Sequence, residues 1–530
     1  MSITGNLYYN GTWQQGLGGT YQAGNPATGE SLAPTMTMAT RAQVVEAVAA
    51  AQEAFLIYKD SSLAERAKFL RECAKEIEAL GEELLTRVSE ETGYPLARAE
   101  GERNRTCGQL RMFADLVEGG SFLDPRIDTA QPDRKPAPKP DLRYLNQALG
   151  PVVVFGASNF PLAFSVAGGD TASALAAGCP VLVKGHSSHP GTSELVAQAM
   201  GRAAKNCKMP AGVFSLLMGS GAEVGSCLVE APEVKAVGFT GSFAGGMALF
   251  KLANARPEPI PVFAEMGSVN PVFLLPGALK ASAAALAKQF VVSLTMGTGQ
   301  FCVNPGLVIA VDGPELDEFV AATAKELADV GAGVMLNERI CSAYCGGLER
   351  YSAVAGVEML AQGHAINVEE GFRAQASLLG TSAENFISNK QIHEEIFGPV
   401  SLLVRCKNDA QRLQVLAHLG GQLTGTIHCA PGELEGHRDL VDALTRKVGR
   451  LVINGFPTGV EVCPSMVHGG PFPASTDARF TSVGTAAIYR FLRAVCYQNF
   501  PEYLLPDALK NSNPLNLTRT INGQATKAVV

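Results

Sequence analysis

Three residues of this chain combine a reactive side-chain type with a place in a turn. Cys302 lies in GQFCVN, where a thiol can be exposed and can become a nucleophile if its pKa is lowered. Glu265 ends the apolar run PVFAE; a carboxylate there is costly unless solvated or paired, so Glu265 is a candidate base. Asn159 follows the run GPVVVF, and its amide can donate to developing negative charge. Each has a plainer alternative: a buried thiol, an ion-paired glutamate and a turn-forming asparagine.

A fourth feature could hold a phosphate. The segment 239–242, FTGS, ends an expected strand and opens an expected helix, where free N–H groups and the helix dipole favour an anion. An ordinary serine-capped turn explains the same letters. Gly219, Gly221 and Gly225 have the spacing G-x-G-x-x-x-G, which differs from the dinucleotide fingerprint G-x-G-x-x-G.

The spacing of histidines and cysteines gives no metal site. His186 and His189 are three residues apart but are flanked by glycine and proline. Cys341 and Cys345 have no matching second pair, whereas a structural zinc site requires four ligands. We therefore predict no metal.

The elements that position these residues change along the chain. Helical periodicity covers residues 39–60, 62–92 and 96–119, and Ser62 with Glu65 forms a capping box. The first third is therefore expected to be a helical layer on a sheet. Residues 124–142 are rich in proline and charge, so no helix persists there. Composition favours a linker, and an extended arm that pairs with another subunit is the alternative.

From residue 150 onward, strands alternate with helices. Strands are expected at 150–155, 180–184, 213–217 and 234–239, and helices at 165–178, 192–206, 222–230 and 243–254. This alternation predicts a parallel, doubly wound sheet, which binds ligands beyond the carboxyl ends of its strands. A second α/β region is expected from Pro261 to about residue 470.

Composition restricts the function classes. The chain has 530 residues, enough for about three domains, and its net charge of −7 argues against a nucleic-acid partner. No stretch reaches the ~18 apolar residues of a membrane span, and we see no secretory signal. Twelve scattered cysteines without such a signal are typical of reduced thiols, so we expect a cytoplasmic protein.

Read together, the motifs resemble the aldehyde dehydrogenase superfamily. GASNFP, VLVKGHS, GFTGS, EMGS, GQFC and EEIFGPV occur in that order, and the resemblance runs from about residue 5 to about residue 500. It implies a doubly wound parallel-sheet cofactor domain, an α/β catalytic domain and a small bridging β element. The implied ranges are 1–123 and 148–262 for the cofactor domain, 124–147 for the bridging arm, 263–470 for the catalytic domain, and 471–530 for the return to the cofactor domain and a C-terminal bridging segment.

The resemblance also implies a mechanism. Cys302, as thiolate, attacks an aldehyde, and the Asn159 amide with the Cys302 N–H stabilises the oxyanion. Hydride transfer to a nicotinamide leaves a thioester, and Glu265 activates the water that hydrolyses it. CoA-acylating relatives usually lack this glutamate, so its presence indicates a free acid as product.

Further residues are implied to hold the cofactor. They are Lys184, Ser187, Gly241, Ser242, Glu395 and Phe397. The commonest family pattern has a glutamate where this chain has Ser187, and losing that carboxylate favours NADP over NAD. The residue that would hold a 2′-phosphate stays open among His186, Arg202 and Lys205.

The substrate is implied at branch level. KGHSSHPGTSELV, INGFPTGVEVCPSMVHGGPFPAS and TSVGTAAIYRFLRAVCYQ resemble the branch of α-ketoglutaric semialdehyde (2,5-dioxovalerate) dehydrogenases and NADP-preferring fatty aldehyde dehydrogenases. Four aromatic residues are candidates for a substrate tunnel, with core packing as the equal alternative: Phe160, Phe164, Phe301 and Phe456. An arginine for a substrate carboxylate could come from Arg103, Arg105 or Arg111.

The resemblance favours the arm over the linker and predicts a homodimer or homotetramer. Two other function classes stay open. A cofactor-independent cysteine hydrolase would need a histidine base near Cys302, and no sequence feature places one there. A non-catalytic protein with the same fold is the other, although the combination of cysteine, glutamate and asparagine argues against it.

Overall fold

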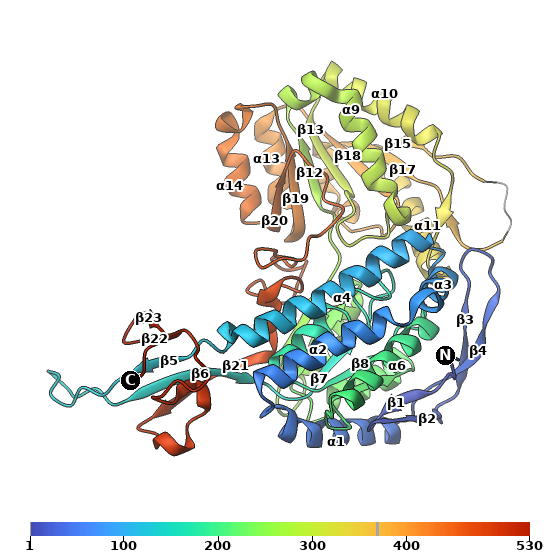
Figure 1. Cartoon of the computed structure of the whole chain (residues 1–530). Coiled ribbons are helices and arrows are strands. Elements are labelled where there is room, and N and C mark those ends of the chain that lie inside the picture. Colours follow the sequence, from blue (N-terminus) through green and yellow to red (C-terminus); the bar gives the residue numbers. More distant parts are fainter. Residues whose placement is uncertain (1, 367–369) are drawn as a thin grey trace.

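The centre of the cofactor half is a sheet of seven strands in the order β11-β10-β7-β8-β9-β1-β2. The computed structural model (Figure 1) describes residues 2–366 and 370–530. The parallel strands are β7 (Val152–Phe155), β8 (Val181–Lys184), β9 (Phe214–Leu217), β10 (Ala236–Thr240) and β11 (Val262–Glu265). Their buried, valine-rich runs are typical of strands covered on both faces. The predicted parallel sheet is confirmed.

Helices cover this sheet. They are α1 (Arg41–Tyr58), α2 (Leu63–Glu78), α3 (Gly81–Thr92), α4 (Leu96–Gly119), α5 (Gly169–Ala177), α6 (Pro190–Asn206), α7 (Ser226–Glu230) and α8 (Phe243–Asn254). The capping box at Ser62 is confirmed, because Ser62 Oγ accepts from the Glu65 N–H at 3.2 Å and Glu65 Oε2 accepts from the Ser62 N–H at 2.9 Å. The periodic stretch 62–92 is two helices, divided at Gly81, whose φ is +58°.

The expectation of a purely helical first third is wrong for its first 37 residues. They contain β1 (Leu7–Tyr9), β2 (Thr12–Gln14), β3 (Thr20–Gly24) and β4 (Ser31–Thr37). Strand β1 pairs antiparallel with β9 and extends the cofactor sheet. Strands β1 and β2, with three residues each, are too short to show an alternating pattern, so periodicity did not reveal them.

The other half is built on a second sheet, in the order β15-β17-β18-β13-β12-β19-β20. The strands are β12 (Pro271–Leu274), β13 (Leu307–Val311), β15 (Val357–Gln362), β17 (Ser377–Ser382), β18 (Val400–Cys406), β19 (Gln422–His428) and β20 (Val448–Ile453), with the short pair β14 (Gly333–Val334) and β16 (Arg373–Ala374) beside them. The helices are α9 (Pro276–Thr295), α10 (Pro314–Ala328), α11 (Glu338–Ser352), α12 (Ala383–Ser388), α13 (Asp409–His418) and α14 (Arg438–Thr445). The expected division at 262–263 cuts through β11, which pairs with β10 of the first sheet, so the first sheet extends to Glu265.

A third sheet projects from the body (Figure 1), in the order β21-β6-β5-β22-β23. It joins β5 (Arg126–Asp128) and β6 (Leu142–Ala148) to β21 (Leu492–Gln498), β22 (Arg519–Ile521) and β23 (Gln524–Thr526). We call this sheet the arm. The proline-rich segment 124–142 therefore contains β5 and leads into β6, and these two strands pair antiparallel. Within the described residues, no helix is long and apolar enough to cross a membrane.

Candidate active site

Cys302 lies on a tightly bent loop between the two halves. The short helical turn Met296–Gly299 precedes it, and residues 297–299 all have positive φ. Gly299 passes so close to Gly398 that a Cβ there would lie 2.4 Å from its carbonyl carbon and oxygen, so only glycine fits. Asn270 Nδ2 donates to the carbonyls of Cys302 and Asn304, both at 2.9 Å, and anchors the other side of the loop.

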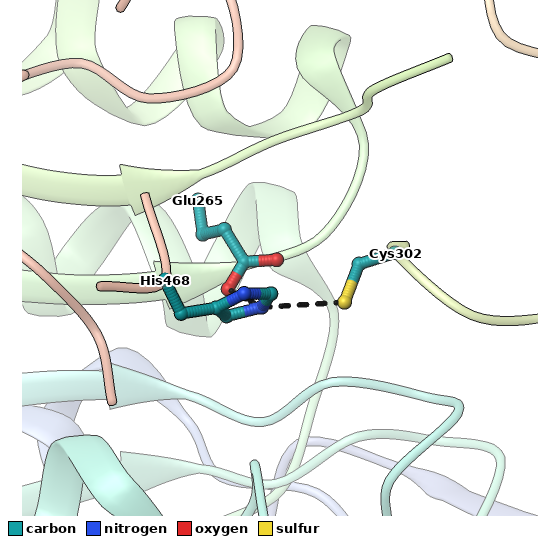
Figure 2. Close-up of side chains that lie close together, drawn as sticks. All are labelled: Glu265, Cys302 and His468. Carbon is teal, nitrogen blue, oxygen red and sulfur yellow. Dashed lines mark hydrogen bonds and ion pairs between the residues drawn. The ribbon is translucent and has the colours of Figure 1, made fainter. Parts of the chain in front are cut away.

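Glu265 and His468 lie beside the Cys302 thiol (Figure 2). His468 Nε2 is 3.0 Å from Glu265 Oε2 and 3.4 Å from Cys302 Sγ. Both side chains are buried, with Glu265 4% and His468 1% exposed, and Ser482 Oγ donates to Glu265 Oε2 at 3.1 Å. Glu265 Oε1 is buried and makes no hydrogen bond. One carboxylate oxygen is therefore held in place, and the other is available to a reactant.

The surroundings shift the pKa values of both reactive groups. Burial raises the pKa of Glu265, but attraction from His468 and hydrogen bonds from His468 and Ser482 outweigh it, so the pKa lies below its ordinary value. Burial raises the pKa of the Cys302 thiol well above its ordinary value, and Glu265 and Glu395 add to this effect. The resting thiol therefore keeps its proton and needs a neighbouring base to become a thiolate.

Asn159 follows β7 and points its amide at the same loop. Its carbonyl accepts from Tyr94 Oη at 3.0 Å and from Arg98 Nη2 at 3.2 Å, and its Nδ2 donates to the Gln300 carbonyl at 3.0 Å. An amide nitrogen has two donor hydrogens, so the second is free for a reactant. Asn159 and Cys302 line the same cavity.

Sequence reasoning missed His468. It lies 166 residues after Cys302, in the segment VHGGPFPAS, whose sequence indicates only the resemblance to a branch of the family. The hydrolase alternative depended on a histidine near Cys302, and the structure places one there. However, Glu265 and Cys302 both contact Nε2, whereas in a hydrolase triad the acid binds the nitrogen opposite the nucleophile.

A cavity of about 1150 Å³ opens at the carboxyl ends of the first sheet and reaches Cys302. The predicted cofactor residues Lys184, Ser187, Gly241, Ser242, Glu395 and Phe397 all line it, together with Asn159, Glu265 and Cys302. The segment Gly219–Ala222 lines it as well. The sequence motifs that were separate along the chain therefore border one space.

The shape and charge of this cavity fit a dinucleotide. Ser242 caps α8, accepting from the Gly245 N–H at 3.2 Å, and the first N–H groups of the helix favour a phosphate. A Cβ on Gly267 would lie 2.3 Å from Glu395 Oε2, so a side chain there would crowd the cavity wall. Burial raises the pKa of Glu395 to about 8; a hydrogen bond from the Ser268 N–H opposes this shift and the charge of Glu265 adds to it.

One end of the cavity is cationic. Burial, with a smaller effect of Arg339, lowers the pKa of Lys184 to about 8. Arg339, from α11 of the other half, lines the cavity with Lys184, His186 and Ser187. Of the residues left open for a 2′-phosphate, only His186 is part of this lining; Arg202 is paired with Glu76 at 2.6 Å. Sequence reasoning missed Arg339, because nothing in the sequence indicated that α11 faces β8.

Three of the four predicted aromatic residues meet beside Cys302. The ring centroid of Phe160 is 5.3 Å from that of Phe164 and 5.2 Å from that of Phe301, and Phe164 is 6.1 Å from His468. Phe456 lies elsewhere: its ring packs on His428 at 4.5 Å and on Phe290 at 5.9 Å, against the core of the second half, which agrees with the alternative of core packing.

Comparisons with known proteins find relatives in one family. The model of the aldehyde dehydrogenase family matches residues 13–471. The chain is 52% identical to alpha-ketoglutaric semialdehyde dehydrogenase 2 of Azospirillum brasilense, over 99% of this chain and 100% of that protein. It is 47% identical to the alpha-ketoglutaric semialdehyde dehydrogenase of Acinetobacter baylyi, over 97% and 99%.

Solved structures show the same fold. Betaine aldehyde dehydrogenase from Staphylococcus aureus, in complex with NAD⁺, has a TM-score of 0.81 at 20% identity, covering 94% of this chain and 96% of that one. A mutant of aldehyde dehydrogenase C from Pseudomonas syringae, in complex with NAD⁺ and octanal, has a TM-score of 0.79 at 23% identity, covering 94% and 97%.

Proposed function

The chain belongs to the aldehyde dehydrogenase family, and we propose that it oxidises 2,5-dioxovalerate, the semialdehyde of α-ketoglutarate, to the dicarboxylate. The reaction consumes the aldehyde, one water and an oxidised nicotinamide dinucleotide, and yields the acid, the reduced dinucleotide and a proton. The observation that carries the proposal is the placement of Cys302, Glu265 and His468 at the end of the dinucleotide-sized cavity, with their reactive atoms within 4.8 Å of one another.

The first step is the attack of Cys302 on the aldehyde carbon. The thiol gives its proton to the Glu265–His468 pair, and the Sγ–C bond forms as the carbonyl oxygen gains negative charge. The free hydrogen of Asn159 Nδ2 and the Cys302 N–H stabilise that oxygen. When bound, the dinucleotide supplies the hydride acceptor for this oxidation. Cys302 then holds the acyl group as a thioester.

The second step is hydrolysis. Glu265 Oε1, which has no partner in the protein, accepts a proton from water, and the water oxygen attacks the thioester carbon. The proton taken from the thiol in the first step leaves to solvent before this hydrolysis. The S–C bond then breaks, and the regenerated thiolate, beside His468, takes the proton that Glu265 received from water. Ser482 and His468 hold the other oxygen of Glu265, so that the base keeps its orientation through both steps.

The test combines a substrate panel with two variants. Wild-type protein is assayed with 2,5-dioxovalerate, succinic semialdehyde, pentanal and octanal, and we expect the first to have the highest kcat/KM. Cys302→Ala should abolish reduction of the dinucleotide while still binding it. Glu265→Gln should give one burst of reduced dinucleotide followed by slow turnover. Retained turnover in Cys302→Ala, or octanal as the best substrate, would contradict the proposal.

We propose NADP as the preferred cofactor. Ser187 removes the carboxylate that would repel a 2′-phosphate, and Lys184, Arg339 and the half-buried His186 line the same end of the cavity. Arg339 offers a planar, permanently charged group of the kind that binds phosphate with two hydrogen bonds. Asn337 Nδ2 donates to Ser188 Oγ at 2.8 Å and holds α11 against this end.

We also propose that the chain assembles at least as a homodimer through the arm. Strand β21 forms an open edge of the arm sheet, and open edges pair readily with another chain. Beyond β21, the aromatic and aliphatic residues Tyr503 and Leu504 are 80% and 57% exposed. Exposed apolar side chains next to an open strand edge support burial against a second subunit.

A further inference from the structure

Two arginines reach Cys302 from elements outside the lining of the dinucleotide cavity. Arg105 lies on α4 and Arg450 on β20, so they come from opposite halves of the molecule. The charge of a Cys302 thiolate acts on both of them. Arg105 also lies over the Phe164 ring, with its guanidinium carbon 5.8 Å from the centroid. Both cations therefore lie near the nucleophile, on elements other than those that line the dinucleotide cavity.

Both arginines hold one loop against Cys302. Arg105 Nη1 donates to the Val460 carbonyl, and Arg450 donates to the carbonyls of Pro457 and Gly459. Cys302 and Val460 both pack against a small apolar cluster formed by Val303, Leu423 and Ala474. Val460 also packs against the cluster that contains Phe164. Val460, whose carbonyl Arg105 holds, therefore belongs to the surroundings of both Phe164 and Cys302.

Arg105 and Arg450 have unused hydrogen-bond donors and no ion-pair partner among the described residues. Each arginine has a buried Nε without a hydrogen bond. Among the described residues, Arg450 forms no ion pair; burial lowers its pKa, and a negative charge on Cys302 would oppose that shift. Arg105 is influenced by Glu102 and Glu461 but is within ion-pair distance of neither. Isolated charges are costly away from water unless something pairs with them.

The two acids near Arg105 are already engaged. Glu102 Oε1 accepts from the N–H groups of Leu162 and Ala163, and burial raises the pKa of Glu102 despite those bonds, which favours its neutral form. Glu461 is exposed and accepts from the Val462 N–H. Within the described residues, neither arginine therefore has a carboxylate at ion-pair distance.

We propose that Arg105 and Arg450 together bind the carboxylate of the substrate, and so select aldehydes that carry an anion at the far end of a short chain. The inference rests on the proposed function and extends it to substrate recognition. Guanidinium groups bind carboxylates with strong, charge-assisted hydrogen bonds. We expect the rings of Phe160, Phe164 and Phe301, which form one cluster, to pack on the carbons between the aldehyde and this anion.

The test compares a charged with an uncharged substrate of equal length. The kcat/KM values for 2,5-dioxovalerate and for pentanal are measured in wild type, Arg105→Met, Arg450→Met and Arg105→Lys. We expect each Met variant to lower the ratio of the two values about tenfold or more, chiefly through KM for the charged aldehyde, and the Lys variant to recover part of it. Arg111→Met is the matched control, since Arg111 lies on the same helix and pairs with Glu78 at 2.6 Å.

The outcomes separate recognition from loop support. A Met variant that loses activity equally on both aldehydes, with the ratio kept, would mean that the arginines only hold the loop, and would overturn the inference. An unchanged ratio with full activity would also overturn it. If wild type prefers succinic semialdehyde to 2,5-dioxovalerate but still prefers either to pentanal, the proposed substrate fails while the anion site stands, and the variants are then tested on that substrate.

Discussion

At the scale of single residues, the Nε2 atom of His468 contacts both reactive groups of the site. His468 Nε2 is close to both Glu265 and Cys302, and a nitrogen with one hydrogen can donate to only one of them at a time. When the thiol is protonated, the hydrogen is available to Glu265; when a thiolate forms, it is available to sulfur. His468 therefore stabilises whichever of the two groups carries the negative charge.

Removing His468 should shift the pH dependence of hydrolysis. Glu265 acts as a base only when ionised, so the rate falls as the pH drops through its pKa, which His468 keeps below the ordinary value. In His468→Gln, the effect of burial on Glu265 is no longer outweighed, so the pKa of Glu265 rises. The acid limb of the plot of kcat against pH should therefore move to higher pH by about one unit or more.

The measurement is single-turnover decay of the acyl-enzyme as a function of pH. Ser482→Ala should shift the limb in the same direction by less, because it removes one hydrogen bond and no charge. His364→Gln, which changes an exposed histidine bonded to the Ala328 carbonyl, is the control. A His468→Gln limb that stays in place would contradict the assignment of Glu265 as the base.

Arg339 should determine the preference between the two dinucleotides. Arg339→Ala removes a permanent positive charge next to Ser187, so KM for NADP should rise about tenfold or more while KM for NAD changes little. Steady-state assays with both cofactors give the ratio. Lys205→Ala is the control: it changes an exposed lysine outside the cavity lining and should leave the ratio of the two KM values unchanged. Equal losses with both cofactors would exclude a phosphate contact.

At the scale of elements, the loop between α9 and β13 determines where the thiol lies. Gly299→Ala should be damaging, because φ of +62° costs about 1–2 kcal/mol for a residue with a Cβ, and that Cβ meets the Gly398 backbone. We expect a lower melting temperature and a smaller burst amplitude. Gly346→Ala is the matched control: it lies in α11 with no atom within 4 Å of its Cβ, and alanine favours a helix. A normal burst in Gly299→Ala would contradict this view.

The strands and the loops that follow them were predictable from the sequence, whereas contacts between the two halves were not. The parallel strands were predictable, because buried β-branched runs between turns occur at regular intervals. The meeting of Asn159, Glu265 and Lys184 was also predictable, since Lys184 and Glu265 end two strands of one sheet and Asn159 follows a third. His468 and Arg339 were not, because each comes from the other half, and local patterns do not report how two halves face each other. The place of Phe456 was not predictable for the same reason: aromatic character next to a motif does not say which core a ring joins.

At the scale of the whole molecule, the two large sheets form one catalytic body and the arm extends from it (Figure 1). The arm has a small core of its own, formed by Ile127, Leu145, Leu505, Ala508, Leu509 and Leu517. The arm is therefore a folded element rather than a loose linker. Its surface carries exposed apolar side chains, among them Tyr503 and Leu504.

The arm should determine the oligomeric state. Sedimentation velocity at micromolar concentration should give wild type at twice the monomer mass or more. Tyr503→Asp combined with Leu504→Asp should shift the protein toward monomer, because two charges are costly in an apolar interface. Leu17→Asp is the control, since Leu17 is 73% exposed on the opposite end of the chain. A monomeric wild type would exclude the assembly.

The separation of the reactive groups along the chain has a consequence for biosynthesis. The ribosome makes Asn159, Glu265 and Cys302 before His468 and Ser482, and 166 residues separate Cys302 from His468. At a rate of synthesis of about 5–20 residues per second, His468 is added on the order of ten seconds after Cys302. A nascent chain thus carries the cysteine without its activating neighbour, and the reactive centre is completed only when the late segment docks.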